Sequence, residues 1–343
     1  MIFSNSFVAS YKEDYPFLKE VDSLALANAQ LNRNTAFKAF FRGKNKKPKF
    51  KSKRNDQSYT TNNINNFTSI KISDNNRYIS IPKCKRIRIK KHRDFEGNIK
   101  SAAISKTCDD KYYISLLVET DIKPLESTNK AIGLDLGVKD LVISSNGFKY
   151  KNHKYLSKSE DKLAREQRKL SHMKKGSNNR EKQRIKIARL HRKIYNQRND
   201  YLHKLSKHII NENQVICVED LKVMKMSKDN DYNKSMMDAS MSKLLNMLIY
   251  KASWYDRTVV KIPFDYPSSQ LCSSCGYKNS TVKDLRIRKW ICPECGSIHD
   301  RDTNAARNIL RKGIEILTKG RNCPDSLFML DPVGSSRKKP QLL

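Results

Sequence analysis

The sequence predicts a mixed fold, in which a small antiparallel β-barrel is followed by an α/β domain that carries a cysteine-rich module. From Ser69 to about Glu119, apolar residues alternate with polar ones at the period of two shown by half-buried strands. After residue 130, short apolar strands alternate with helical segments, which is the pattern of an α/β domain. Two C-x-x-C pairs lie between Cys272 and Cys295.

The composition indicates a polyanionic partner. The 343 residues contain 69 Lys plus Arg and 35 Asp plus Glu, a formal net charge of +34. Basic residues spread along the whole chain suit a long nucleic acid, and a membrane surface is the rival polyanion. No apolar run approaches the roughly 18 residues of a membrane span, and the N-terminus lacks a secretory signal. We therefore expect a cytoplasmic protein of two or three domains.

The first half of the chain is predicted to pass from helices to strands. Residues 1–45 are typical of helix, with Ala25, Leu31, Ala36 and Phe40 as candidate core residues. The basic stretch 44–54 predicts either a solvated linker or a phosphate contact. Hairpin turns at Asn75-Asn76 and 108–111 separate the strands of the barrel.

The second half is predicted as strands at 131–137, 141–144, 214–219 and 258–262, with helices at 240–255 and from Thr303 onward. A charged helical hairpin covers 157–211 and breaks at 175–179. The tail, 319–343, is polar and contains prolines, and we expect it to be disordered.

The cysteine pairs predict a structural zinc site. Cys272, Cys275, Cys292 and Cys295 form two tight turns, each with two thiols, and two such turns complete a tetrahedron around zinc. Four thiolates leave no open coordination position, so the metal would hold a small ribbon together. Cys84, Cys108, Cys217 and Cys323 lack such spacing and are interpreted as ordinary small residues.

Asp135 lies at an unusual place for a charged residue. It interrupts an apolar strand in which Ile132, Leu134 and Leu136 share one face, so its carboxylate lies on the other. Its neighbours Gly133 and Gly137 would leave open space beside it. The plain alternative is an aspartate paired with a nearby lysine.

Two further carboxylates are candidates for the same site. Glu219 ends the apolar strand that starts at Val215, and Asp220 is the alternative to it. Asp302 precedes a helical stripe, and it would point toward the strands if that stripe packs on the sheet. Asp302 is also a good helix N-cap. The residues of the stripe are Ala306, Ile309, Gly313 and Leu317.

Three carboxylates meeting in a basic protein predict a divalent cation site. Hard oxygen ligands suit Mg²⁺, and two such ions about 4 Å apart activate a water and stabilise the leaving oxygen of a phosphodiester.

The helical hairpin is predicted either to be a solvated coiled coil or to track phosphates, and its excess of basic residues favours phosphate contact. Its candidate nucleic-acid contacts are Arg165, Arg168, Lys169, Lys174, Lys175, Arg184, Arg189 and Arg192.

Taken together, these motifs resemble the OrfB/TnpB family of insertion-sequence proteins, which are related to type V CRISPR nucleases. The resemblance rests on 15–21, 40–43, 48–53, 133–139, 218–221, the two cysteine pairs and 300–306. It implies an RNase H-like (RuvC) nuclease domain in which Asp135, Glu219 and Asp302 bind the metal ions, with the zinc ribbon inserted. It also implies a guide RNA, transcribed from the element's end, that pairs with double-stranded target DNA beside a short adjacent motif.

The resemblance also implies a division of the chain. The expected parts are a partial helical recognition segment at 1–45, a wedge-like barrel at 46–127, a RuvC-like core at 128–265, a zinc ribbon at 266–299, the last RuvC motif and helix at 300–318, and the tail at 319–343. Family members usually begin with a further barrel strand and helices. We therefore expect a misassigned start codon or a truncated copy, with competent chemistry but impaired target recognition.

Two other functions fit the same residues. One is a transposase that cuts with the same carboxylates and needs no guide. The other is a nucleic-acid-binding regulator of transposition that does not cut. We expect no obligate protein partner in any of these cases.

Overall fold

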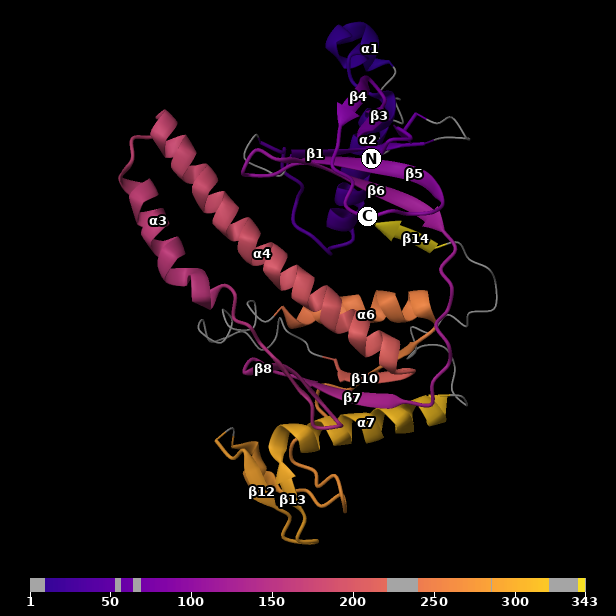
Figure 1. Ribbon diagram of the computed structural model, residues 1–343, viewed down its shortest axis with the longest axis vertical. Coiled ribbons are helices and arrows are strands. Elements are labelled where there is room, and N and C mark those ends of the chain that lie inside the picture. Colours follow the sequence, from indigo (N-terminus) through magenta and orange to yellow (C-terminus); the bar gives the residue numbers. More distant parts are fainter. Residues whose placement is uncertain are drawn as a thin grey trace. The chain divides into compact units, whose positions relative to one another are not determined.

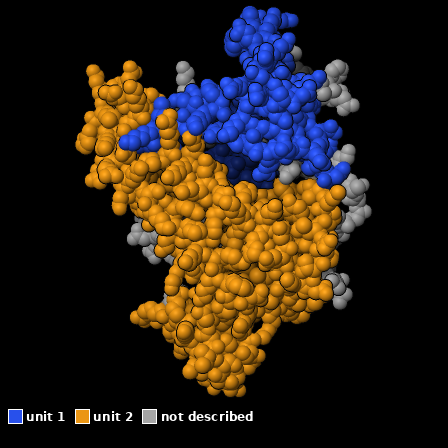
Figure 2. Space-filling view, in the orientation of Figure 1, with its two compact units in different colours: residues 1–121, 184–188, 337–343 blue, residues 122–183, 189–336 orange. Residues whose placement is uncertain are grey.

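The computed structural model describes residues 10–52, 57–63, 69–220, 240–284, 286–320 and 339–342. The chain divides into two compact units (Figure 2), with 1–121, 184–188 and 337–343 in unit 1 and 122–183 and 189–336 in unit 2. Predictions that concern Lys53, Arg54, Leu221 and Cys323 fall outside the described residues. Within the described ranges, no helix has both the length and the apolar character needed to cross a membrane.

Unit 1 consists of helices followed by two antiparallel sheets (Figure 1). The sheets have the strand orders β1-β5-β6-β14 and β2-β3-β4 and share one apolar core that includes Ile79, Ala102 and Val118. The elements are α1 Tyr11–Asp14, the 3-10 turn η1 Pro16–Lys19, α2 Ser23–Phe41, β1 Gln57–Asn62, β2 Lys71–Ile72, β3 Tyr78–Ile81, β4 Cys84–Arg88, β5 Asn98–Lys106, β6 Tyr112–Thr120 and β14 Lys339–Leu342.

The N-terminal helical segment is interrupted rather than continuous. Pro16 begins the separate turn η1, and Asp22 then caps α2 by accepting a hydrogen bond from Leu24 N. Ala25 is buried as predicted, whereas Leu31 is 62% exposed, so placing Leu31 in the core was wrong.

Two strands of unit 1 carry no sequence pattern that predicts them. β1 has the polar sequence QSYTTN and pairs with β5 through backbone hydrogen bonds, from Gln57 opposite Lys106 to Asn62 opposite Ser101. β14 pairs with β6, so the expected disorder of the tail is wrong for 339–342. The open edge of a strand offers unpaired N–H and C=O groups to any extended segment, whatever its side chains.

Unit 2 is built on a five-stranded mixed sheet with the order β11-β10-β7-β8-β9. β7 pairs in parallel with β10 and β10 with β11, whereas β8 and β9 are antiparallel. The elements are β7 Ala131–Leu136, β8 Asp140–Ser144, β9 Lys149–Lys151, the 3-10 turn η2 Ser157–Ser159, α3 Glu160–His172, α4 Asn178–Glu212 (apart from 184–188, which belong to unit 1), β10 Val215–Glu219, α6 Met241–Tyr255, β11 Thr258–Ile262, the 3-10 turn η4 Ser280–Lys283, β12 Lys289–Ile291, β13 Ile298–Asp300 and α7 Arg301–Gly320.

Helices cover both faces of this sheet (Figure 1). Ile132, Leu134 and Leu136 of β7 lie in one core cluster with residues of α4 and α6. Cys217 of β10 lies in a second cluster with Ile309 of α7. The alternation predicted for 131–137 is therefore confirmed, and the face opposite the apolar side chains of β7 is the one that α7 covers.

The charged hairpin also has the predicted form. α3 ends at His172 and α4 begins at Asn178. Gly176 adopts a φ of +84°, and the side chain of Ser177 caps α4 by accepting a hydrogen bond from Arg180 N.

Two glycines let α7 lie unusually close to the sheet. A Cβ added at Gly133 of β7 would overlap Ala306 O and lie 2.7 Å from Leu310 N. A Cβ added at Gly313 of α7 would lie 2.6 Å from the Cβ of Cys217 and overlap its sulfur. The expectation that Gly133 and Gly137 leave open space beside Asp135 was wrong. The backbone of α7 fills the space at Gly133, and a Cβ added at Gly137 would lie 2.8 Å from the carbonyl oxygen of Asp140.

We predict that Gly313→Ala lowers the free energy of unfolding by about 1–3 kcal/mol. The overpacking against Cys217 outweighs the gain of about 1 kcal/mol in helix propensity. In the double variant with Cys217→Gly, the loss should be clearly smaller than the sum of the two single losses. Urea denaturation measures all three, with the exposed Thr318→Ala on the same helix as a control. Additive losses would contradict the close approach.

Candidate active site and cysteine cluster

Parallel pairing brings Asp135 and Glu219 to neighbouring positions. In the register of β7 and β10, Leu134 lies opposite Val218, and Asp135 and Glu219 are the next residues of their strands. Both follow residues of the apolar α4 and α6 cluster, so both belong to the opposite face, which α7 covers.

Asp302 enters the same region from the first turn of α7. The predicted stripe packs on the sheet: Ala306 and Ile309 are fully buried, and Gly313 contacts Cys217. Asp302 lies one helical turn before Ala306, and its Oδ2 is 3.5 Å from Nη1 of Arg288.

Asp300, not Asp302, caps α7. Oδ1 of Asp300 accepts hydrogen bonds from N of Thr303 at 3.0 Å and from its hydroxyl at 3.1 Å, and Oδ2 pairs with Lys149 at 2.9 Å. The interpretation of Asp302 as the N-cap was therefore wrong, because the helix begins at Arg301, two residues earlier than the sequence indicates. Asp302 is consequently not needed for capping.

The three carboxylates interact electrostatically. Burial, followed by the negative charges of Glu219 and then Asp302, raises the pKa of Asp135 to about 8 in total, while Arg301 acts in the opposite direction. Burial also raises the pKa of Glu219, against the effect of a hydrogen bond from Ser268. A cation among these groups would offset both the burial and the mutual repulsion, so the donor set fits a hard divalent ion.

Asp220 takes no part in this cluster. Its Oδ1 lies 3.5 Å from Nζ of Lys261, and about half of its side chain is exposed. The structure therefore favours Glu219 over the alternative Asp220.

The four cysteines of the C-x-x-C pairs lie together. Their four sulfur atoms all lie within 4.8 Å of one another, and they belong to Cys272, Cys275, Cys292 and Cys295. The Cys272–Cys295 and Cys275–Cys292 sulfurs are each 3.6 Å apart, close to the roughly 3.8 Å edge of a tetrahedron with metal–sulfur bonds of about 2.3 Å. Of the other cysteines in the described residues, Cys84 and Cys108 are exposed and Cys217 is buried.

His299 belongs to the surroundings of this cluster, which the sequence did not indicate. Its Nε2 lies 3.0 Å from the sulfur of Cys272, and its ring packs against Trp290. A lone histidine outside any ligand spacing gives no sequence signal, although its position in β13, next to the start of α7, could have suggested a contact with the module.

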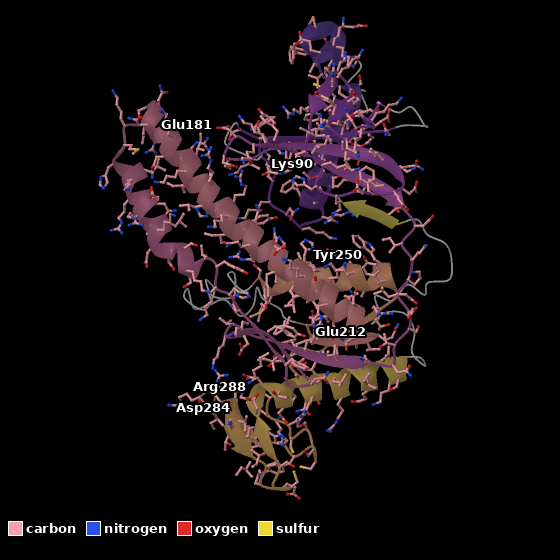
Figure 3. The ribbon with its side chains drawn as sticks, in the orientation of Figure 1. Lys90, Glu181, Glu212, Tyr250, Asp284 and Arg288 are labelled. Atoms are coloured by element: carbon pink, nitrogen blue, oxygen red, sulfur yellow. The ribbon has the colours of Figure 1, made fainter. Side chains whose placement is uncertain are left out.

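The cysteine module is tied to the start of α7 by two arginines. Arg288, labelled in Figure 3, reaches Asp302, and Arg301 donates a hydrogen bond to the carbonyl of Asp284 at 3.0 Å. Arg301 is buried. These contacts place basic groups from the module and the helix beside the carboxylates.

Three polar residues beside the carboxylates were also missed. Ser268 donates a hydrogen bond to Glu219, and Asn304 and Asn308 of α7 bind the chain around Ser268 and Leu271. Asparagines at i and i+4 on the buried face of an otherwise apolar helix are the signal that could have identified them.

The candidate nucleic-acid contacts lie on α3, α4 and the turn between them. Six are exposed, whereas Arg184 and Arg192 are partly buried. Arg184 donates a hydrogen bond to the carbonyl of Cys108 at 2.7 Å within unit 1. The exposed six are Arg165, Arg168, Lys169, Lys174, Lys175 and Arg189.

Comparison with known proteins identifies related sequences over most of the chain. The family model described as "Probable transposase" matches residues 113–230, and that described as "Cas12f1-like, TNB domain" matches 242–309. A "Putative RNA-guided DNA endonuclease" of Streptomyces pristinaespiralis is 36% identical over 305 residues, which cover 88% of this chain and 74% of the relative. The "Putative RNA-guided DNA endonuclease InsQ" of Escherichia coli (strain K12) is 33% identical, over 89% of this chain and 78% of the relative.

A solved structure has a similar fold. A chain in the "Cryo-EM structure of the Cas12f1-sgRNA-target DNA complex" superposes with a TM-score of 0.59 at 17% sequence identity, over 90% of this chain and 76% of that chain. At this identity the similarity concerns the mixed α/β fold alone.

We predict that Asp300 and Asp302 differ in their effect on stability. Asp300→Ala removes the cap of α7 and should lower the free energy of unfolding by about 1 kcal/mol. Asp302→Asn removes a charge that repels Asp135, so without added divalent ions it should leave stability unchanged or raise it. Urea denaturation compares the two, and a larger loss in Asp302→Asn would show that Asp302 is the structural residue.

Proposed function

The chain belongs to the OrfB/TnpB family of transposon-encoded proteins, and we propose that it is an RNA-guided DNA endonuclease that acts in transposon maintenance. The observation that carries the proposal is that Asp135 and Glu219 lie at neighbouring positions of β7 and β10, on the face covered by α7, whose first turn carries Asp302. The relatives in Streptomyces and Escherichia, whose names give this activity, support it.

The proposed nuclease domain is RuvC-like, with residues 128–265 and 300–318 as its parts and the ribbon 266–299 inserted between them. The strand order, with three parallel strands and an antiparallel edge, supports this assignment. We further propose that 1–45 is a partial recognition segment, that 46–127 is a wedge-like barrel, and that the cell compartment is the cytoplasm.

In the proposed mechanism, Asp135, Glu219 and Asp302 hold Mg²⁺. Bound Mg²⁺ would supply an activated water and stabilise the leaving oxygen of the scissile phosphodiester. The protein's own contribution would be to hold the three carboxylates within electrostatic reach of one another before an ion binds. Burial and the hydrogen bond from Ser268 restrict the carboxylates, and Arg301 compensates part of their charge.

The proposed partners are two nucleic acids, a guide RNA and the target DNA. The net charge of +34 and the six exposed basic residues of the hairpin support binding of phosphates. A guide RNA from the element's end would supply sequence recognition by base pairing, and the protein would bind the phosphate backbones of the RNA and of the target duplex. No obligate protein partner is needed for this arrangement.

For the cysteine cluster, the proposed metal is zinc in a structural role. Four thiols with tetrahedral spacing leave no open position for substrate or water.

We predict that Asp135→Ala abolishes cleavage, by about 10³-fold or more, while RNA and DNA binding persist. The matched control is Asp220→Ala, which removes a nearby carboxylate outside the cluster and should leave cleavage within about threefold. The assay uses the chain purified from cells that carry its element, sequencing of the bound RNA, and a matching DNA target with randomised flanks in Mg²⁺.

Two results of this assay would contradict the proposal. Equal cleavage with and without the co-purified RNA would identify a transposase that needs no guide. Binding without cleavage in every divalent metal tried would identify a regulator.

We also predict about one zinc per chain by elemental analysis. Cys292→Ser should lose most of this zinc and lower the thermal midpoint, because the ribbon core of Val282 and Trp290 is too small to fold alone. Cys84→Ser, which changes an exposed cysteine far from the cluster in sequence, should keep the zinc. A cooperative, unchanged melting transition in zinc-free protein would exclude the structural role.

A further inference from the structure

Ser268 holds one oxygen of Glu219. Its hydroxyl donates a hydrogen bond of 2.5 Å to Oε1 of Glu219, and the residue is only 7% exposed. Ser268 lies in the segment between β11 and Cys272, so it comes from neither of the strands that carry Asp135 and Glu219. Hydrogen bonds to a carboxylate are among the stronger ones in proteins, and this bond restricts the orientation of Glu219.

Asn308 of α7 fixes Ser268. Its Nδ2 donates hydrogen bonds to the carbonyls of Ser268 at 2.8 Å and Leu271 at 2.6 Å. Asn308 is 1% exposed, so both bonds are protected from water. The backbone on either side of this segment is therefore held to one side chain of the helix that also carries Asp302.

Asn304 extends the same set of bonds to the first cysteine turn. Its Nδ2 donates to the carbonyl of Leu271 at 2.6 Å, and its Oδ1 accepts from N of Ser273 at 2.8 Å. Leu271 and Ser273 flank Cys272, so Asn304 binds the backbone on both sides of a cysteine of the cluster. Asn304 and Asn308 are one helical turn apart and share a face of α7.

The printed bonds thus form a continuous series from the Cys272 turn, through Asn304 and Asn308, to Ser268 and Glu219. A purely structural role would account for the asparagines, since buried backbone groups need partners. It would not account for the last bond, which ends on a carboxylate of the candidate active site.

We propose that Ser268 is a positioning residue for Glu219 and that metal at the cysteine cluster, acting through Asn304 and Asn308, sets the affinity of the three carboxylates for divalent ions. The inference rests on the proposed function, in which Glu219 is a metal ligand. A carboxylate that is already oriented loses less freedom when it binds an ion, and groups that orient ligands typically change metal affinity by about 10–100-fold.

The first test measures Mn²⁺ binding to the whole protein by calorimetry, without nucleic acid and with zinc retained. The specific part of the binding is the part that Asp135→Asn removes. Ser268→Ala should weaken this part by about 10–100-fold, and Ser268→Thr, which keeps a hydroxyl, should recover most of it. The Mg²⁺ concentration for half-maximal cleavage should rise by a similar factor, with the rate at saturating Mg²⁺ changed much less.

Asn213→Ala is the matched control. Asn213 is also buried, and its amide donates to the carbonyl of Ile209 at 2.9 Å, at the end of α4. It should cost stability as a lost buried hydrogen bond does, yet leave Mn²⁺ affinity unchanged. If Asn213→Ala and Ser268→Ala weakened Mn²⁺ binding equally, general destabilisation would explain the effect, and the inference would be overturned.

The second test asks whether the cysteine cluster is coupled to the carboxylates. Zinc is removed with a chelator, which is then separated from the protein before Mn²⁺ is titrated. Specific Mn²⁺ affinity should fall several-fold in the wild type and much less in Ser268→Ala, in which the last bond of the series is missing. No fall in the wild type, or the same fall in both, would overturn the coupling.

The outcomes separate the two proposals. A wild-type protein without any Asp135-dependent Mn²⁺ binding would overturn the proposed metal-dependent nuclease, and the inference with it. Asp135-dependent binding that Ser268→Ala leaves intact would overturn the inference alone.

Discussion

The close approach of α7 to strands β7 and β10 is the constraint on which the candidate site depends. Gly133 and Gly313 remove the two Cβ atoms that would hold the helix away from the sheet. Because Asp302 is carried by that helix, the height of α7 above the sheet decides how near Asp302 comes to Asp135 and Glu219. A methyl group at either glycine would overlap atoms of the neighbouring element, so the helix or its neighbours would have to move, and Mg²⁺ sites, which demand near-ideal geometry, tolerate such shifts poorly. The glycines therefore connect core packing to the chemistry.

The same closeness has an electrostatic cost. Three carboxylates in a partly desolvated place repel one another, as the raised pKa of Asp135 reflects. The chain offsets this only in part, with Arg301 inside the site and Arg288 at its edge. Elsewhere the protein is strongly basic, so the site is a small negative centre in a molecule of net charge +34. A site that is unfavourable when empty and stabilised by cations is what the proposed metal-dependent nuclease would require, at a cost in stability.

Much of this could be predicted from the sequence, because the decisive patterns are local. The period of two separates Asp135 from Ile132, Leu134 and Leu136, and the C-x-x-C spacing identifies the cysteine cluster. What failed depends on contacts between distant segments. Whether Gly133 faces open space or a helix is decided by α7, some 170 residues away in the chain. The choice between Asp300 and Asp302 as the cap depends on a two-residue shift of a helix start, which no propensity resolves. β1 is held by backbone pairing alone, so its side chains carry no pattern.

The position of the cysteine module in the chain gives it a role beyond its own fold. It lies between β11 and α7, and its hydrogen bonds and ion pairs go to the first turns of α7. Its own core contains only Val282 and Trp290 together with two of the cysteines, so we expect its folding to depend on the proposed zinc. The first turns of α7, which carry Asp302 and Asn304, contact this module, so the proposed zinc would order them together with the module. In the proposed nuclease, the cluster of thiols would therefore influence phosphodiester cleavage without contacting the substrate, by restricting the position of α7 and of the carboxylate that it carries.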